Sequence, residues 1–298
     1  MSHMLNTKHI QRTLVQHAFS RACNHYDEHA VLQREIADRL LAHLNFTKIE
    51  PERILDVGCG TGYFTRLLIE KYKKSEVMAC DLSEEMVQHT RRHHRRRMLW
   101  HGKRQHIVAD ACGLPFADES FDLVTSNLTM QWVVNPKEML MEMRRVLRPN
   151  GLMLFSTFGR RTLSELRHAL ASISESSEQS KVRHVLPFPD VMSLGDILNQ
   201  LPLEAPVLDS DLLTLTYPDV MSLVRELKGM GASSSAISGR SQGLYGRRLL
   251  RELDASYGAL HRNEEGRIYA GFEALYAQAW YKKTAFIPKG GVIPISSE

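Results

Sequence analysis

A run of acidic and glycine residues is the most chemically specific pattern in the chain. Asp56 is followed at alternate positions by Gly58, Gly60 and Gly62, with Cys59 inside the loop. Glycines there allow a positive φ and let a ligand approach the backbone, and the amides that open the next helix face that ligand. A dinucleotide loop has a different glycine spacing and holds pyrophosphate, which a carboxylate at position 56 would repel. The pattern predicts a ligand with a cationic ammonium group, although a plain tight turn would also explain the glycines.

Two further aspartates stand where a nucleoside site would need them. Asp81 ends the apolar run 76–80, nineteen residues after Gly62, where a carboxylate can accept hydrogen bonds from both ribose hydroxyls. Asp110, followed by Ala111, ends a third apolar run at 106–109. Either aspartate could equally cap a helix or a turn. Three acids that end three successive strands nevertheless predict one binding site along one sheet edge.

The elements that must position these acids alternate between strands and helices up to about residue 158. Apolar runs at 54–57, 76–80, 106–109, 121–126 and 147–155 predict five strands, and runs at 207–217 and 267–283 predict a sixth and a seventh. In the seventh, Phe272, Tyr276 and Trp280 share one face at period two. We therefore expect an α/β fold, with a doubly wound, Rossmann-like, mostly parallel sheet of seven strands.

Length and composition allow one full core with additions, since the chain has 298 residues of which 43% are hydrophobic. About fifty residues separate the last two predicted strands, which is too long for a simple hairpin and predicts a helical insertion. We expect an N-terminal helical cap at 1–50, a core at 51–216 and 266–284, an insertion or lid at 217–265, and a tail at 285–298.

Composition also argues against several classes of function. No run of 18 apolar residues occurs, so the sequence predicts no membrane span. The formal net charge of +4 does not indicate a nucleic-acid partner. The four cysteines form no C-x-x-C pair, which predicts reduced thiols in the cytoplasm, with no disulfide and no metal site. The arginine-rich segment 91–104 is typical of a solvated helix end, where cations complement the helix dipole.

The acid-and-glycine loop, the acid at 81 and the run "LRPNG" at 147–151 together resemble the class I S-adenosylmethionine-dependent methyltransferases. The resemblance implies S-adenosylmethionine as the cofactor and an antiparallel last strand. It implies that the following residues contact the cofactor: Tyr26, Gln33, Asp56, Gly58, Cys59, Gly60, Gly62, Asp81, Leu82, Met86, Asp110, Ala111 and Asn127. For Cys59, a small filler side chain is a better explanation than a nucleophile.

Segments 19–41, 127–136 and 227–257 are similar to the carboxyl methyltransferases of biotin synthesis. That resemblance implies methylation of the free carboxylate of malonyl-acyl carrier protein, giving the methyl ester that starts pimeloyl synthesis. The first segment also resembles a mitochondrial complex I assembly factor of the same superfamily. Two alternatives therefore stay open: another class I methyltransferase acting on a small acid or a phenol, and a non-methylating assembly factor with this fold.

The implied chemistry needs few catalytic groups, because a carboxylate with a pKa of about 4 is already ionised at neutral pH. Orientation and the exclusion of water then carry the reaction, with Tyr26 and Trp132 as candidate residues. Tyr26 and Gln33 are expected to close the N-terminal helices over the methionyl end, although ordinary helix packing explains them equally well. An acidic carrier protein implies a basic docking rim. Its candidates, each equally compatible with a solvated helix face, are Arg240, Arg247, Arg248 and Arg251, with Arg144 and Arg145 behind them.

Overall fold

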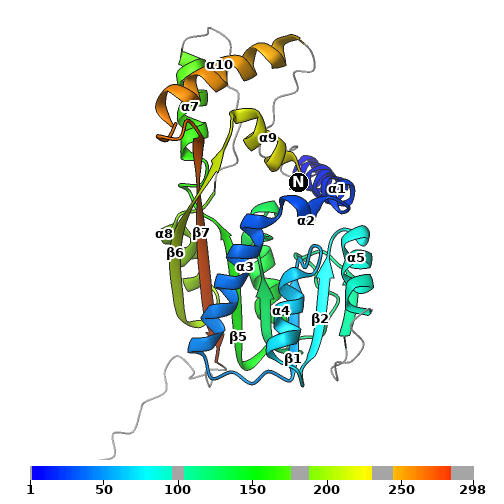
Figure 1. The fold of residues 1–298 in the computed structure, drawn as a ribbon. Helices are drawn as coiled ribbons and strands as arrows, with labels where there is room; N and C mark the ends of the chain where they lie inside the picture. Colours follow the sequence, from blue (N-terminus) through cyan, green and yellow to red (C-terminus); the bar gives the residue numbers. More distant parts are fainter. Residues whose placement is uncertain (1, 96–103, 176–187, 230–243, 283–298) are drawn as a thin grey trace, which may run out of the picture.

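Seven strands form one sheet in a computed structural model that describes residues 2–95, 104–175, 188–229 and 244–282 (Figure 1). Their order across the sheet is β3-β2-β1-β4-β5-β7-β6. The strands are β1 (Arg53–Val57), β2 (Glu76–Asp81), β3 (Arg104–Val108), β4 (Phe121–Ser126), β5 (Leu147–Phe158), β6 (Glu204–Tyr217) and β7 (Ile268–Tyr281). β7 runs antiparallel to both β5 and β6. The predicted doubly wound sheet with an antiparallel last strand is thus confirmed.

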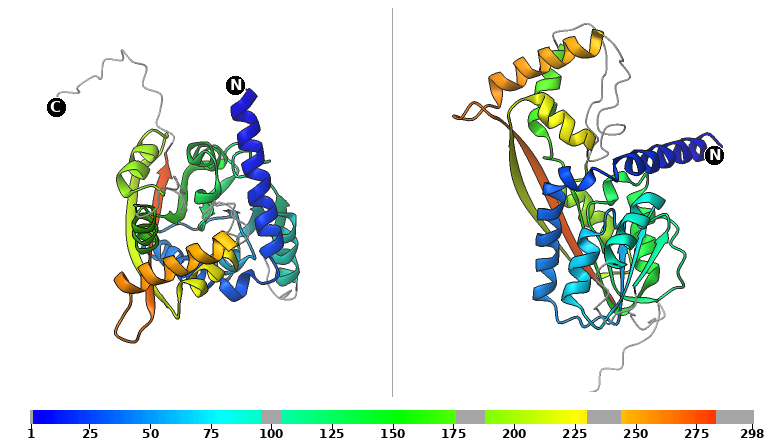
Figure 2. Two further views of the ribbon diagram at one scale, coloured as in Figure 1. Left: turned by 90° about the horizontal axis from the view of Figure 1, so that it is seen from above. Right: turned by 45° about the vertical axis from the view of Figure 1, so that its right-hand side comes forward.

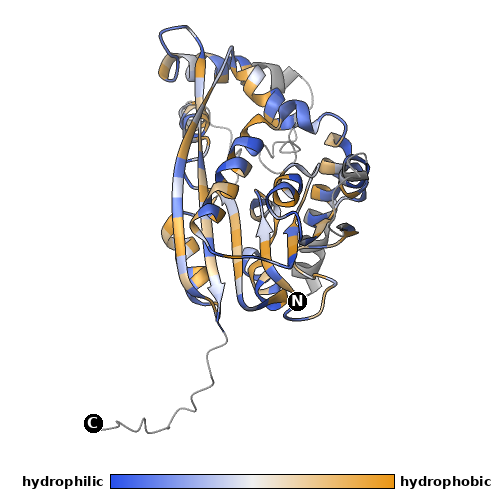
Figure 3. Ribbon diagram, turned by 60° about the horizontal axis from the view of Figure 1, so that its bottom comes forward, coloured by the Kyte–Doolittle hydropathy of each residue, from blue (hydrophilic) through white to orange (hydrophobic). Residues whose placement is uncertain are grey.

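Helices cover both faces of the sheet. They are α1 (Ser2–Ala22), α2 (Tyr26–His29), α3 (Val31–His43), α4 (Tyr63–Lys71), α5 (Glu84–Arg95), α6 (Pro136–Val146), α7 (Ser164–Glu175), α8 (Val191–Asn199), α9 (Val220–Gly229) and α10 (Leu244–Leu260). Buried side chains of α3 and α4 pack on one face of the sheet, and those of α6 and α8 on the other. Hydrophobic residues accordingly follow the strands and the inner sides of the helices (Figure 3).

The register of the central strands decides where the acids meet. β1 and β2 are almost entirely buried, as expected for parallel strands covered on both faces. Val57 pairs with Cys80, and Asp81 pairs with Val108. The residues that follow β1, β2 and β3 therefore lie side by side at the carboxyl edge of the sheet, where open α/β sheets bind their ligands.

Strands β6 and β7 are 14 residues long each and extend past the other strands, with α7, α9 and α10 near their far end (Figure 1). Phe272 and Tyr276 are buried in the core cluster formed by one face of β7, and Trp280 packs against the same cluster. This confirms the predicted shared face. No helix in the described part of the chain is both long and apolar enough to cross a membrane.

The N-terminal helices α1 and α3 pack against different parts of the molecule. Helix α1 crosses above the carboxyl ends of the first strands, close to α5 (Figure 2). Helix α3, by contrast, buries Leu32, Ile36 and Leu40 completely within the main core. The proposed division into a cap, a core, an insertion and a tail stays a prediction, but α3 belongs to the core by its packing.

The sequence predicts that the arginine-rich segment 91–104 ends one helix, but the structure divides this segment between a helix and a strand. Helix α5 ends at Arg95 and strand β3 begins at Arg104, while residues 96–103 lie outside the described part. Arg104 therefore belongs to the edge strand of the sheet, because pairing with β2 extends β3 back to that residue.

Candidate active site

Two adjoining cavities lie at the carboxyl ends of the parallel strands. The larger has a volume of about 300 Å³ and the smaller about 50 Å³. Both are bordered by Tyr26, Gly58, Gly60, Asn127 and Leu128. The two cavities therefore adjoin one another across these residues.

The glycine loop forms part of the floor of both cavities. Gly60 has a φ of +54°, and apart from Gly60 and its two chain neighbours no atom of the described residues lies within 4 Å of the position that a Cβ would take there. A ligand can therefore approach its backbone closely. Gly62 differs, because its Cβ would come within 2.6 Å of Thr90 Cγ2. Gly62 borders neither cavity, so its predicted contact with the cofactor is not supported; it allows α4 to start close to Thr90.

Asp81 offers a fixed carboxylate to the larger cavity. Its Oδ2 accepts a hydrogen bond from the Gly60 amide and its Oδ1 one from the Ser83 amide, both at 2.9 Å. Each carboxylate oxygen keeps further acceptor capacity. Burial raises the pKa of Asp81, while the amide hydrogen bonds oppose that rise. The arrangement suits a diol whose two hydroxyls need acceptors on one side of the ligand.

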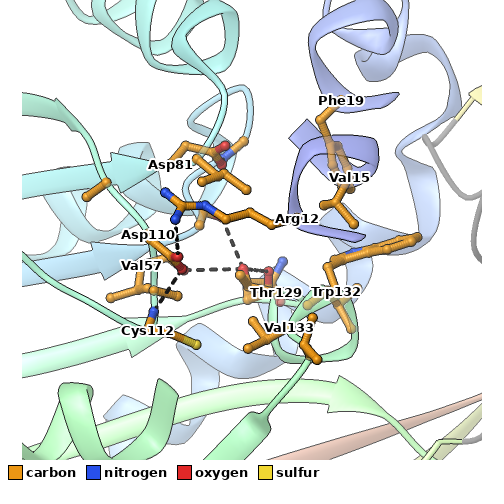
Figure 4. Close-up of a pocket in the computed structure, with 18 of the residues that line it drawn as sticks. Arg12, Val15, Phe19, Val57, Asp81, Asp110, Cys112, Thr129, Trp132 and Val133 are labelled. Carbon is orange, nitrogen blue, oxygen red and sulfur yellow. Dashed lines mark hydrogen bonds and ion pairs between the residues drawn. The ribbon is translucent and has the colours of Figure 1, made fainter. Parts of the chain in front are cut away.

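Asp110 borders the same cavity one strand further along the sheet, and the Arg12 side chain of α1 reaches it (Figure 4). Its Oδ1 accepts a hydrogen bond from the Cys112 amide at 3.0 Å. Its Oδ2 forms an ion pair with Arg12 of α1 at 3.1 Å. Asp110, which the family resemblance placed among the cofactor contacts, thus also forms an ion pair with an N-terminal helix.

Asp56 lies on β1 behind the smaller cavity and is only 1% exposed. The hydroxyls of Thr65 and Thr125 donate hydrogen bonds to it, at 2.5 and 3.4 Å. Burial raises the pKa of Asp56 to about 7, although these hydrogen bonds oppose the shift. A nearby cation would favour the ionised form, which supports the predicted pairing with an ammonium group.

Aromatic side chains of α1, α2 and the segment after β4 form one wall of the larger cavity. The rings of Phe19 and Trp132 meet edge to face at 5.1 Å between centroids, and Phe19 lies 6.2 Å from Tyr26. Burial, and then the charges of Asp81 and Asp27, raise the pKa of Tyr26. The Tyr26 hydroxyl therefore stays protonated and can act as a hydrogen-bond donor but not as a base.

Comparison with known proteins assigns the chain to a family. A family model described as "Methyltransferase domain" matches residues 55–155. The malonyl-[acyl-carrier protein] O-methyltransferase of Halorhodospira halophila is 41% identical over 271 residues, which are 91% of this chain and 88% of that protein. The protein of the same name from a Methylovorus species is 36% identical over 96% of this chain and 94% of its own. The chain belongs to the malonyl-[acyl-carrier protein] O-methyltransferase family.

The fold of this methyltransferase family member also occurs in distant solved structures. The YcgJ protein of Bacillus subtilis superposes with a TM-score of 0.57 at 16% sequence identity, over 83% of this chain and 99% of that one. At that identity the likeness concerns the fold alone. The sheet order by itself puts the expected ligand site at the carboxyl edge of the sheet.

Most of the residues predicted from sequence border the two cavities. They are Tyr26, Gln33, Asp56, Gly58, Cys59, Gly60, Asp81, Leu82, Asp110, Ala111, Asn127 and Trp132. Met86, a residue of α5, borders neither cavity. Its side chain is fully buried, and its amide donates a hydrogen bond to Ser83 Oγ at 3.3 Å. Burial raises the pKa of the Cys59 thiol well above its usual value, which fits a small filler side chain.

The predicted docking arginines are not brought together at the cavities. Arg144 and Arg145 end α6 just before β5 begins, which is the opposite edge of the sheet. Arg145 donates hydrogen bonds to Glu142 and Asp118 at 2.8 Å, and Arg144 lies 3.7 Å from the ring centroid of Tyr281. Both thus make contacts within the chain at the edge of the sheet away from the cavities, and their role in docking stays a prediction.

The remaining candidates lie in or near the insertion. Arg251 is exposed on α10. Arg247 and Arg248 belong to the same helix, but their side chains, like all of Arg240, lie outside the described part. Their role in docking therefore stays a prediction.

Several residues that border the cavities are not among those predicted from the sequence. They are Arg12, Val15 and Phe19 of α1, Asp27 and Arg34 near the start of α3, and Thr129 after β4. The first three recur at helical spacing, which would have indicated a common face. Spacing alone does not reveal that this face covers a cavity rather than a core.

Proposed function

We propose that this chain transfers a methyl group from S-adenosylmethionine to the free carboxylate of malonyl-acyl carrier protein, producing a methyl ester. The observation that carries the proposal is the 41% identity to a malonyl-[acyl-carrier protein] O-methyltransferase across 91% of the chain, a stretch that includes the cavity-lining residues of the core. The implied product suits the start of pimeloyl synthesis, in which a masked carboxylate can be elongated as an ordinary acyl chain.

The geometry of the two cavities fits S-adenosylmethionine. Asp81 would accept the ribose hydroxyls and Asp110 the adenine amino group, while the backbone at Gly60 leaves room for the ligand. The smaller cavity, bordered by Asp27, Asp56 and other polar groups, would take the charged amino-acid end. When bound, the cofactor supplies an electrophilic methyl group on a sulfonium.

The protein needs to supply orientation rather than proton transfer. None of the described residues bordering either cavity is a histidine or a lysine, and an ionised carboxylate needs no base. The aromatic side chains of Phe19, Tyr26 and Trp132 exclude water from one side of the larger cavity. Holding the two reactants in line can lower the barrier by about 7–11 kcal/mol, and desolvating opposite charges favours their conversion into neutral products.

The partner is inferred to be an acidic carrier protein, which presents the malonyl group on a long flexible arm. Its charge would be matched by exposed arginines such as Arg251 of α10, since complementary charges steer the encounter of two proteins. We infer a reducing, cytoplasmic location, because Cys23, Cys59, Cys80 and Cys112 are all free thiols.

Incubation with labelled S-adenosylmethionine and malonyl-carrier protein tests the proposal. We expect a base-labile methyl ester on the carrier protein, and a specificity constant far above that for free malonate, because remote contacts orient the reacting carboxylate. Free malonate and a small phenol serve as matched acceptors. Equal specificity constants for malonate and malonyl-carrier protein would contradict a carrier-dependent enzyme, and absence of any transfer would favour an assembly factor.

A further inference from the structure

The smaller cavity contains a guanidinium with an unused donor. Arg34 of α3 borders it, together with Asp27 and Asp56. Its Nη2 donates to the Asp27 carbonyl at 2.8 Å and lies 3.6 Å from Asp27 Oδ1. Its Nε is buried and has no hydrogen-bond partner among the described residues. A buried donor left without an acceptor is unfavourable, so this group is arranged for an acceptor that the polypeptide itself does not provide.

The orientation of this guanidinium is fixed from two sides. Besides its bond to the Asp27 carbonyl, Arg34 lies over the ring of Tyr63, at 5.6 Å from the centroid. The Tyr63 hydroxyl is in turn held by Asp38, at 3.1 Å from both carboxylate oxygens. A stacked, anchored arginine presents its remaining N–H groups in a set direction, and its planar fork matches a carboxylate.

The charges around the cavity specify a ligand that carries both signs. The carboxylates of Asp27 and Asp56 suit a cation, while the free donor of Arg34 suits an anion. A small cavity of about 50 Å³ brings these sites close together. The α-amino and α-carboxylate groups of an amino acid have that arrangement, and Tyr26 and Gly58 connect the site to the nucleoside cavity.

We propose that Arg34 binds the α-carboxylate of the methionyl part of S-adenosylmethionine; the proposal rests on the function proposed above. Arg34 is then the residue that distinguishes ligands with a complete amino-acid end from truncated nucleosides. By fixing that end, it also sets where the sulfonium methyl lies relative to Phe19 and Trp132. Arg34 acts as a positioning residue for the methyl group rather than on the acceptor.

Ligand binding, measured without any acceptor, tests the assignment. The probes are S-adenosylhomocysteine, its decarboxylated analogue and 5′-methylthioadenosine, titrated calorimetrically into the wild-type protein and Arg34→Ala. We expect Arg34→Ala to weaken S-adenosylhomocysteine binding by about 10- to 100-fold, the range for a charged hydrogen-bonded pair. Binding of the two ligands that lack the carboxylate should change less than about twofold, since they never made the contact. Arg34→Lys should recover part of the loss.

Arg39→Ala provides a matched control on the same helix. Arg39 bonds Asp211 at 2.7 Å and borders neither cavity, so its removal should leave all three affinities unchanged. Equal losses for all three ligands in Arg34→Ala would overturn the proposal, because they would indicate collapse of the cavity. The proposal would also be overturned if Arg34→Ala bound S-adenosylhomocysteine as tightly as the wild type does, or if the wild type did not bind S-adenosylhomocysteine at all. If Arg34→Ala loses affinity only for S-adenosylhomocysteine, but the wild type transfers no methyl group to malonyl-carrier protein, the role of Arg34 is upheld and only the proposed function is refuted.

Discussion

Two acids at the carboxyl edge of the sheet, one buried and one half-buried, have different surroundings. Asp81 is held by two amides at 2.9 Å and still faces the larger cavity. Asp56 has only hydroxyl donors and is 1% exposed. Backbone amides favour a carboxylate, whereas burial favours the neutral acid. Asp81 therefore presents a carboxylate suited to the proposed ribose contact, and a cation close to Asp56 would favour its ionised form.

Replacing Asp81 with alanine should abolish tight cofactor binding while leaving the fold intact. The change removes two charge-assisted acceptors from the ribose, and we expect affinity for S-adenosylhomocysteine to fall by about 100-fold or more. Titration calorimetry measures the loss, and circular dichroism checks the fold. Arg39→Ala, which lies away from the cavities, is the control. Unchanged affinity in Asp81→Ala would remove Asp81 from the site.

The raised pKa of Asp56 predicts that the ligand-free protein loses stability as pH rises. Its pKa is about 7 in the folded protein and 3.8 in a model peptide, so the folded state binds the proton more tightly. The free energy of unfolding should therefore fall between about pH 4 and pH 7, relative to Asp56→Asn, and the difference should level off above that. Urea unfolding of both proteins at a series of pH values measures this. A constant difference across the range would contradict the assignment.

At the scale of elements, α1 is held to the rest of the molecule largely by polar contacts. Gln16 donates to the Leu82 carbonyl at 3.2 Å, and the hydroxyls of Ser20 and Ser83 meet at 3.0 Å. Of the apolar residues of α1 whose side chains are described, only Val15 and Ala18 are buried. A helix with few buried apolar contacts opens at lower cost than one buried in the core, so we expect α1 to open more readily than α3.

The ion pair between Arg12 and Asp110 should slow the release of bound product. Because both partners are part-exposed, at 52% and 29% of the side chain, we expect a modest effect. Arg12→Ala should raise the dissociation rate of S-adenosylhomocysteine about two- to fivefold, the range for such a pair. Stopped-flow dissociation at increasing salt should show a rise for the wild type and a flatter response for the variant.

Arg21→Ala is the control for that experiment, since Arg21 is exposed on the same helix and borders neither cavity. An Arg12→Ala protein that keeps the wild-type dissociation rate and salt response would show that α1 does not retain the ligand through this pair. A slower dissociation would instead indicate that Arg12 competes with the adenine amino group for Asp110.

At the scale of the whole molecule, the described parts of α7, α9 and α10 form a separate layer at the far end of β6 and β7 (Figure 1). Helix α9 reaches from there toward α2, where Gly229 lies against the ring of His29. The insertion thus contacts the N-terminal helices that cover the cavities.

Reversing two arginines of the insertion should slow docking more than it changes cofactor affinity. In Arg248→Glu with Arg251→Glu, we expect association with malonyl-carrier protein to fall several-fold, because exposed charges act over a Debye length of about 8 Å. Wild-type activity should decline as salt rises, and the double variant should respond less. Stopped-flow association in a salt series measures both. Arg91→Glu with Arg92→Glu, on α5, is the matched control; if that pair instead reproduces the loss, docking takes place at the α5 arginines.

The order of elements and the positions of the strand-end acids follow from short-range patterns, which is why the sequence predicts them. Strand alternation, the glycine loop and an acid at the end of each strand depend on local backbone geometry. The parallel pairing that brings Asp81 and Asp110 to one edge follows from the same alternation of strands and helices. The sheet, its antiparallel last strand and most cavity-lining residues were thus predictable, the last strand through the family resemblance.

Tertiary packing decided the rest, because a helix presents several faces and the sequence does not say which one meets a ligand. Arg34 and Gln33 are neighbours, yet only the packing of α3 shows that Arg34 borders the smaller cavity and that its buried Nε has no partner among the described residues. Gly62 matches the glycine pattern but packs against Thr90. The charge of Arg145 indicated a docking role, whereas its position at the end of α6 assigns it to the opposite edge of the sheet. Residue type and spacing therefore fixed the chemistry available to this protein, and the packing of α1, α3 and α6 fixed which groups reach the site.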